Sequence, residues 1–167
     1  YRPGKFGTKA AQFADATTNF SSNPSFETGT TGWSALLGAT LTQTGTESLV
    51  GNYAMRITHV ASTTSGAQAT AYSTSTAGTY TTSAYLRSYI GSDVGYNCSL
   101  LMRFTYTDAS TEDTSANHTL TDEWTRVSVT ATTNSAKTLS SITVLVRDLL
   151  SGGAPYSMVD AVQPENT

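Results

Sequence analysis

Apolar and polar residues alternate with a period of two along most of this 167-residue chain. The alternating runs are rich in β-branched and aromatic residues, and clusters of Gly, Ser, Thr and Asn separate them. Such a period places successive side chains on opposite faces of a strand, so it predicts antiparallel strands with one buried face. The predicted strands are Phe26–Glu27, Ala39–Thr42, Tyr53–His59, Ala67–Ser73, Thr79–Ile90, Tyr96–Tyr106, Thr125–Thr132, Ser141–Asp148 and Ser157–Gln163.

Turn-forming residues separate most of these strands. Short strands joined by turns pack as two sheets, so we expect an all-β fold, an antiparallel β-sandwich with four or five strands in each sheet. The length fits one domain. Residues 1–18 lack clean alternation and hold three of the nine Lys and Arg residues, which predicts an N-terminal linker or arm before a sandwich at 19–167. The predicted turns are Gly29–Gly32, Gly45–Asn52, Thr63–Gly66, Gly91–Gly95, Asp108–Asn117 and Ser151–Pro155.

Composition narrows the possible partners. Charged residues make up 13% of the chain and the formal net charge is -3, which argues against nonspecific binding to nucleic acid. No apolar run approaches the ~20 residues that cross a bilayer, so membrane insertion is not expected. The abundance of Ser and Thr is typical of extracellular or virion-surface β proteins. Cys98 is the only cysteine, which excludes an intrachain disulfide and predicts a small buried side chain.

The segment from Asn23 to Trp33, NPSFETGTTGW, carries the most distinctive motif. Its Asn-Pro pair starts a turn, and Phe26 and Trp33 are large apolar anchors on either side of a polar loop. Glu27 is then placed beside main-chain carbonyls released by the turn, a setting that suits a hard cation. An ordinary turn between two buried aromatic residues explains the same pattern.

Seven segments occur in an order that resembles the carbohydrate-binding modules of families four, nine and twenty-two. The resemblance covers Asn19 to Glu165 and implies a galactose-binding-like jelly roll. It implies a non-catalytic module that recognises a poly- or oligosaccharide on the concave face of one sheet. The segments are NPSFETGTTGW, SLVGNYAMRITHV, TYTTSAYLRSYIG, LLMRFTYTD, TLTDEWTRVSVTAT, SITVLVRD and PYSMVDAVQPE.

The resemblance also implies a structural Ca²⁺ site. In such modules the ion ties the opening Phe-Glu segment to the Asp of the last strand, and main-chain carbonyls complete the shell. Glu27 and Asp160 occupy the matching positions, and Asn52 or its loop is a further candidate ligand. Two carboxylates and several carbonyls form an oxygen-only cage of the kind that Ca²⁺ prefers. Alternatively, Glu27 and Asp160 cap turns or pair with Lys or Arg.

Alternation sorts three of the strands into faces, and the resemblance implies that Ala84, Leu86 and Ile90 are the inner residues of the first. Tyr85, Arg87 and Tyr89 point outward from one strand, Arg103 from the next, and Arg147 from a third. If the three strands belong to one sheet, these five side chains share its outer face. Aromatic rings stack on sugar C–H groups, and guanidinium groups bind vicinal hydroxyls or carboxylates. The set therefore predicts a ligand-binding face, with several arginines favouring an anionic glycan.

Other roles for these residues stay open. The arginines can instead pair with acidic side chains or with neighbouring subunits of a larger assembly. Trp33 and Trp124 are expected to be mainly buried. No Asp or Glu lies on the three candidate strands between their turns, whereas a glycosidase needs two carboxylates about 5 to 10 Å apart, so an enzyme is not expected. The alternative function is a decoration, fibre or adhesin module of a phage virion or extracellular filament.

Overall fold

A computed structural model describes residues 18–89, 93–149 and 153–166, and these form a β-sandwich. The predicted arm at residues 1–18 lies almost entirely outside the described residues. Within the described ranges, no helix is long and apolar enough to span a membrane. The strands are β1 (Trp33–Leu36), β2 (Thr40–Thr44), β3 (Ala54–Thr58), β4 (Gly66–Ala69), β5 (Tyr72–Ser73), β6 (Thr79–Ser88), β7 (Asn97–Tyr106), β8 (Thr111–Thr119), β9 (Thr125–Thr132), β10 (Leu139–Asp148) and β11 (Tyr156–Asn166).

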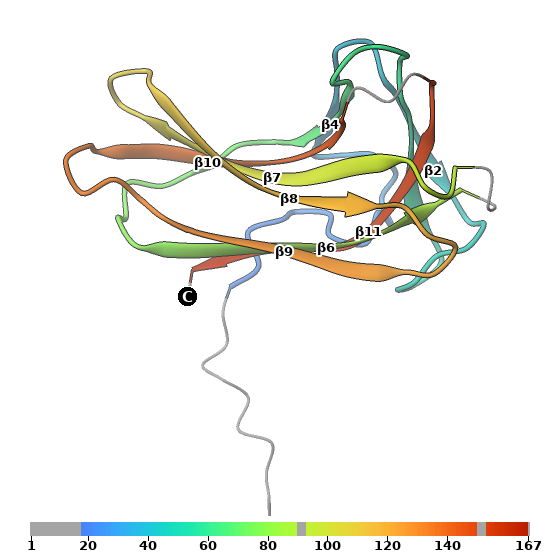
Figure 1. Cartoon of the computed structure of the whole chain (residues 1–167). Coiled ribbons are helices and arrows are strands. Elements are labelled where there is room, and N and C mark those ends of the chain that lie inside the picture. The colour runs from blue at the N-terminus through green and yellow to red at the C-terminus, as the bar shows by residue number, and fades with distance from the viewer. Residues whose placement is uncertain (1–17, 90–92, 150–152, 167) are drawn as a thin grey trace, which may run out of the picture.

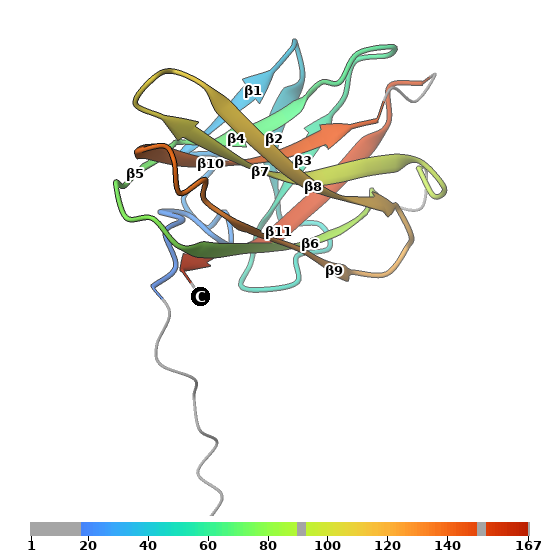
Figure 2. The same cartoon turned by 60° about the vertical axis from the view of Figure 1, so that its left-hand side comes forward.

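Two antiparallel sheets form the layers of the sandwich (Figures 1 and 2). Sheet A has six strands in the order β1-β4-β10-β7-β8, with β5 paired to β10. Sheet B has five strands in the order β2-β3-β11-β6-β9. The predicted all-β sandwich of two antiparallel sheets is therefore confirmed.

The motif at Asn23–Trp33 forms a turn and not the predicted strand at Phe26–Glu27. The amide Nδ2 of Asn23 donates hydrogen bonds to the carbonyls of Gly29 and Thr31, at 2.9 and 3.1 Å, which closes the turn on itself. Phe26 adopts a left-handed φ of 57° and is fully buried against Trp33, with ring centroids 5.5 Å apart. The prediction of two buried aromatic anchors is confirmed, because their burial holds the turn on the core.

Strand β8 occupies part of the segment that was predicted to be a turn. Its sequence, TEDTSANHT, has no apolar alternation, and most of its residues are exposed. The strand forms because the central strand β7 pairs with it along nine residues. Pairing with a neighbour thus overrides a weak local preference for strand.

The core lies between the inner faces of the two sheets. Tyr80 from sheet B meets Phe104 from sheet A edge to face, with ring centroids 5.9 Å apart. Cys98 is 1% exposed, as predicted, and burial raises the pKa of its thiol to about 12. The alternating residues of β7 and β10 supply much of the rest: Leu100, Met102, Tyr106, Ile142, Val144 and Val146.

One polar side chain, His59, is built into this interior. Its Nδ1 lies 2.9 Å from the carbonyl of Ser65 and its Nε2 lies 2.8 Å from Oγ of Ser157. A neutral ring with hydrogen on Nδ1 donates to the carbonyl and accepts from the hydroxyl. Desolvation lowers the pKa of His59, and the attraction of Asp148 and Asp93 offsets only part of this effect.

The buried histidine gives a pH dependence of stability. Its folded pKa lies below the unfolded value of about 6.5, so the unfolded chain takes up the proton first. We expect the protonation of His59 to have no effect on the free energy of unfolding above about pH 6.5. Below that pH it should fall by up to about 1.4 kcal/mol per pH unit.

Urea unfolding of the wild type and of His59→Asn at several pH values between 5 and 7.5 measures this effect. His118→Asn is the comparison, because burial also lowers the pKa of this less enclosed ring. Most of the slope should disappear in His59→Asn and persist in His118→Asn. An equal slope in the wild type and His59→Asn would contradict the assignment.

Candidate functional site

The three strands predicted to share one sheet lie in two. β7 and β10 pair within sheet A, whereas β6 lies in sheet B. Arg103 and Arg147 therefore point away from the core on one side of the molecule, and Tyr85, Arg87 and Tyr89 on the other. The assumption of a single sheet is wrong because strand order depends on pairing partners that are distant in sequence. The five candidate residues form two separate groups.

The outer face of sheet A carries rows of side chains that run across its strands. One row is Leu36, Gly66, Arg147, Ser99 and Asn117, from β1, β4, β10, β7 and β8 in turn. The next row is Ser34, Gln68, Leu145, Leu101 and Ser115. Five strands at the usual spacing span about 19 Å. This face thus presents hydroxyl, amide and guanidinium groups over a length that suits several sugar units.

Leu101 and Leu145 form a second apolar layer on this outer face. They are only 2% and 1% exposed, although they lie outside the main core. Arg147 stands in the neighbouring row, yet its charge acts on Asp113 on the far side of the leucine row. We infer that the aliphatic stem of Arg147 crosses the two leucines and shields them.

Arg103 forms a two-pronged ion pair with Asp113 on the adjacent strand β8. Its Nε and Nη2 donate to Oδ1 and Oδ2, both at 2.7 Å. These bonds, followed by the attraction of Arg103 and Arg147, lower the pKa of Asp113. The alternative expectation, that an arginine of the candidate face pairs with an acidic neighbour, is therefore confirmed for Arg103.

Two buried polar atoms on this face have no partner among the described residues. They are Nε of Arg147 and Oγ of Ser99, which occupy facing positions on β10 and β7. Buried polar atoms are nearly always hydrogen-bonded, so these two atoms need a water or a ligand as a partner. We call Gln68, Ser99, Asn117 and Arg147 the polar strip. Sequence reasoning found only Arg147 of these, because an uncharged polar residue on the outer face of a strand carries no distinctive signal of a binding role.

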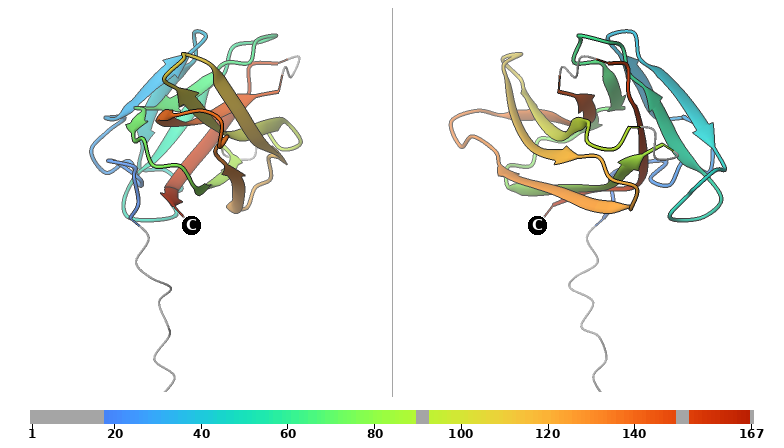
Figure 3. Two further views of the ribbon diagram at one scale, coloured as in Figure 1. Left: turned by 90° about the vertical axis from the view of Figure 1, so that its left-hand side faces the viewer. Right: turned by 45° about the vertical axis from the view of Figure 1, so that its right-hand side comes forward.

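The shape of sheet A brings its ends toward the polar strip. The turn that joins β7 to β8 and the loops around β1 and β4 rise on the same side, away from sheet B (Figures 1 and 3). The outer face of sheet A is therefore the concave side of this curved sheet. Gly66 lies within it, and a Cβ there would overlap the carbonyl oxygen of Val146. Glycine lets β4 approach β10 and leaves space beside Arg147.

The outer face of sheet B has a different chemistry. Tyr85 lies between Asp160 and Arg126 in register, and Arg87 stands 5.8 Å from the ring centre of Trp124 and 3.4 Å from Oε2 of Glu47. Tyr89 packs against Tyr156, with centroids 5.9 Å apart. Trp124 is only partly exposed, which agrees with the prediction that it is mainly buried. Its indole packs against Arg87 outside the core.

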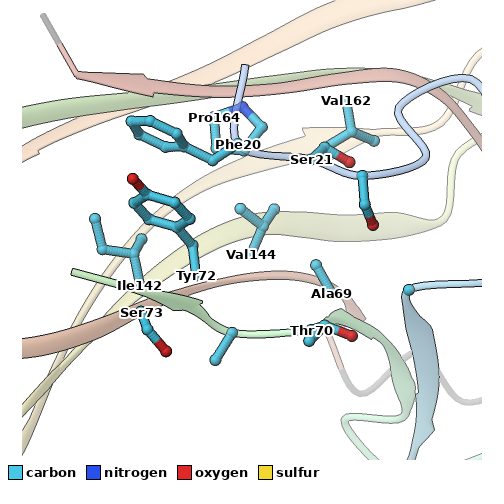
Figure 4. Close-up of a pocket in the computed structure, with 13 residues that line it drawn as sticks. Phe20, Ser21, Ala69, Thr70, Tyr72, Ser73, Ile142, Val144, Val162 and Pro164 are labelled. Carbon is cyan, nitrogen blue, oxygen red and sulfur yellow. The ribbon is translucent and has the colours of Figure 1, made fainter. Parts of the chain in front are cut away.

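A cavity of about 200 Å³ opens between the two sheets beside the short strand β5. Phe20 and Tyr72 stack in parallel at its edge, with centroids 4.0 Å apart, and aliphatic side chains such as Val144 and Val162 line its interior (Figure 4). The cavity contains none of the predicted site residues. It reaches the inner side of the sandwich and does not join the polar strip.

The residues predicted to hold calcium form a clasp around one loop. Oδ2 of Asp160 accepts hydrogen bonds from the N–H groups of Leu49 and Val50, at 2.8 and 2.9 Å. Oε1 of Glu27 accepts from the N–H groups of Asn52 and Tyr53, at 2.9 and 3.0 Å. The two acids thus bind successive parts of the same loop, Leu49–Tyr53. Asn52 contributes its main-chain N–H to this arrangement.

The charge of the clasp suits a cation. Asp160 is fully buried, and its pKa is raised by desolvation, partly offset by the N–H donors and increased by the charge of Glu27. Among the described residues, no group of three or more His, Cys, Asp or Glu side chains gathers. A hard cation at the clasp would therefore have these two carboxylates as its charged ligands, and main-chain or water oxygens would complete its shell.

The sequence was compared with known families and structures. A family model described as a carbohydrate binding domain, CBM_4_9, matches residues 18–148. The chain belongs to this family. No curated protein matches the sequence.

Solved structures show the same fold as this module. The CBM22-1 xylan-binding domain of Paenibacillus barcinonensis Xyn10C has a TM-score of 0.73 at 19% identity and covers 92% of this chain and 97% of that domain. A family 16 carbohydrate binding module-2 has a TM-score of 0.67 at 17% identity, covering 87% and 99%. The active domain of tailspike protein 4 from bacteriophage CBA120 has a TM-score of 0.66 at 11% identity, covering 89% and 21%. The predicted jelly roll of carbohydrate-binding modules is confirmed.

The clasp requires glycine at position 51, and this requirement can be tested. This residue has a φ of +74°, and a Cβ would overlap Oε1 of Glu27. Gly29 is a matched control, because its φ is +76° and no atom lies within 4 Å of an added Cβ. Left-handed backbone alone costs roughly 1 to 2 kcal/mol in a residue with a Cβ.

We expect Gly29→Ala to show this backbone effect and Gly51→Ala to lose distinctly more stability, since it also displaces Glu27. Urea unfolding of both variants measures the difference. Equal losses would show that the Glu27 contacts add nothing to the stability of the folded module.

Proposed function

We propose that this module binds a polysaccharide of the xylan class along the polar strip on the concave face of sheet A. It acts outside the cell and does not catalyse a reaction. The observation that carries the proposal is the unpaired couple of buried polar atoms, Nε of Arg147 and Oγ of Ser99. Sugar hydroxyls are both donors and acceptors, so the hydroxyls of a bound chain offer partners to both atoms.

The polar strip supports a particular mode of recognition. Packing of the Arg147 stem on Leu101 and Leu145 would leave its guanidinium little freedom to lose on binding. Gln68 and Asn117 flank it on β4 and β8 and offer amide groups to neighbouring sugar units. No described strand residue on this face is aromatic, so hydrogen bonds dominate the contact. Each adds about 1 kcal/mol net, which favours weak binding that repeated modules strengthen.

The state of Asp113 supports a non-catalytic role. It is the only carboxylate among the described strand residues of this outer face, and Arg103 engages both of its oxygens. Its lowered pKa keeps it ionised at neutral pH, whereas a glycosidase needs a protonated acid and a second carboxylate.

Titration of soluble xylan into the wild type and Arg147→Met tests the proposed strip. Methionine keeps a long apolar stem over the two leucines but removes the charged donors. Because hydrogen bonds to charged groups contribute about 1.5–3 kcal/mol, we expect binding to weaken by about tenfold or more.

Lys137→Met is the control, because it removes a positive charge that lies at the end of the sandwich, near Ser110 and Glu112. Its affinity for xylan should match that of the wild type. Absence of binding by the wild type, or unchanged binding by Arg147→Met, would refute the proposal.

We also propose that Ca²⁺ binds at the clasp, with Glu27 and Asp160 as carboxylate ligands and the loop around Asn52 nearby. The raised pKa of Asp160 supports this: its folded pKa exceeds the unfolded value, so its ionisation at neutral pH destabilises the fold. A bound divalent cation would offset this loss of stability. The ion would supply charge neutralisation and hold the loop, with no part in sugar binding.

Thermal unfolding with excess Ca²⁺ and with a chelator tests the proposed ion. Binding to the folded state alone raises stability by about 2.7 kcal/mol at 100 times Kd. We expect a higher Tm with Ca²⁺ for the wild type and no such rise for Asp160→Asn. A Tm that is unaffected by Ca²⁺ and chelator in the wild type would count against the site.

A further inference from the structure

The outer face of sheet B carries an arrangement of arginines and aromatic rings. Arg56, on β3, has its guanidinium carbon 4.9 Å from the ring centre of Tyr89 and 5.5 Å from that of Tyr156. Arg87, on β6, lies 5.8 Å from the ring centre of Trp124. We call these five residues the arginine–aromatic face. Each guanidinium is thus held by at least one π system, an attraction that favours a fixed position.

The face is ordered by strand register. Met158 of β11 lies directly between Arg56 and Arg87 and is fully buried beneath their row. The two arginines are therefore two strand spacings apart, about 10 Å at their Cα atoms. All five residues of the arginine–aromatic face are partly exposed. They form a surface layer with a flat, buried support.

The arginines of this surface share the outer face of sheet B with two carboxylates, those of Asp160 and Glu165. Arg56, Arg87 and Arg126 point outward from sheet B and are three of the six Lys and Arg residues within the described ranges. The formal net charge of the whole chain is -3. Arg87 pairs with Glu47, whereas Nε of Arg56 is buried and has no hydrogen-bond partner among the described residues. A buried guanidinium nitrogen without a partner favours a ligand that brings an acceptor, and a carboxylate is the strongest such acceptor.

We propose that the arginine–aromatic face is a second carbohydrate site, selective for polysaccharides that carry carboxylate groups, such as uronates. Aromatic rings accept the C–H faces of sugars, and a guanidinium binds a carboxylate through two parallel hydrogen bonds. Both groups occur here side by side, whereas the polar strip has no aromatic residue. A uronate unit presents both complementary features on one ring.

This site does not depend on the proposed function of sheet A, because the two outer faces lie on opposite sides of the sandwich. A module with both sites can hold two polysaccharide chains at once. Neutral chains bind the concave face and acidic chains the opposite face. Simultaneous engagement raises the avidity for a mixed polysaccharide network without any new contact.

Titration of a short oligogalacturonate into the wild type, Arg56→Met and Arg87→Met tests the second site. The fully methyl-esterified oligomer is the matched ligand, since it keeps the sugar ring and loses the charge. We expect the acid form to bind and each variant to weaken binding by about tenfold or more. Binding should also weaken with added salt, whereas the ester should bind at least tenfold more weakly than the acid.

Arg147→Met separates the two sites. It should keep its affinity for oligogalacturonate while losing affinity for xylan, and Arg56→Met should show the reverse. The second site is refuted if the wild type does not bind the acid oligomer, if Arg56→Met and Arg87→Met bind it unchanged, or if the ester binds equally well. Neither of the first two results would affect the xylan proposal.

Discussion

The antiparallel ladder between β7 and β10 is the constraint on which both the core and the concave face depend. Because side chains alternate along each strand, one register fixes two surfaces at once. Met102 and Val144 face each other in the core, and Ser99 and Arg147 face each other outside it. A shift of one residue would exchange these sets. The polar strip is therefore held in place by the same hydrogen bonds that align the apolar interior.

The two outer faces of the sandwich differ in how they hold arginine. On sheet A, Arg147 stands in the row next to a buried pair of leucines, and Arg103 is held by Asp113. On sheet B, aromatic rings hold Arg56 and Arg87. An arginine over aliphatic groups leaves its donors for hydroxyls, whereas an arginine among rings forms part of a stacking surface. The same residue type thus stands in two different chemical environments on the two faces.

Several features could be predicted from the local sequence, for physical reasons. The alternation that gives β6, β7 and β10 their inward and outward residues follows from strand geometry, so Arg87, Arg103 and Arg147 were correctly predicted to point outward. The anchors Phe26 and Trp33 were recognisable because large aromatic residues beside a turn must be buried. Strand β8 was not predictable, because its polar residues carry no signal and its partner β7 imposes the conformation.

The sequence by itself therefore determined the β-sandwich and the inward and outward residues of its central strands. The tertiary structure decided which strands are neighbours. The strand order places Tyr85, Arg87 and Tyr89 on one face and Arg103 and Arg147 on the other. The structure also adds Ser99 to the second group, and Arg56 and Tyr156 to the first. The physical reason is that alternation is a local property of one strand. Strand order results from hydrogen bonds and burial between segments that are far apart in sequence.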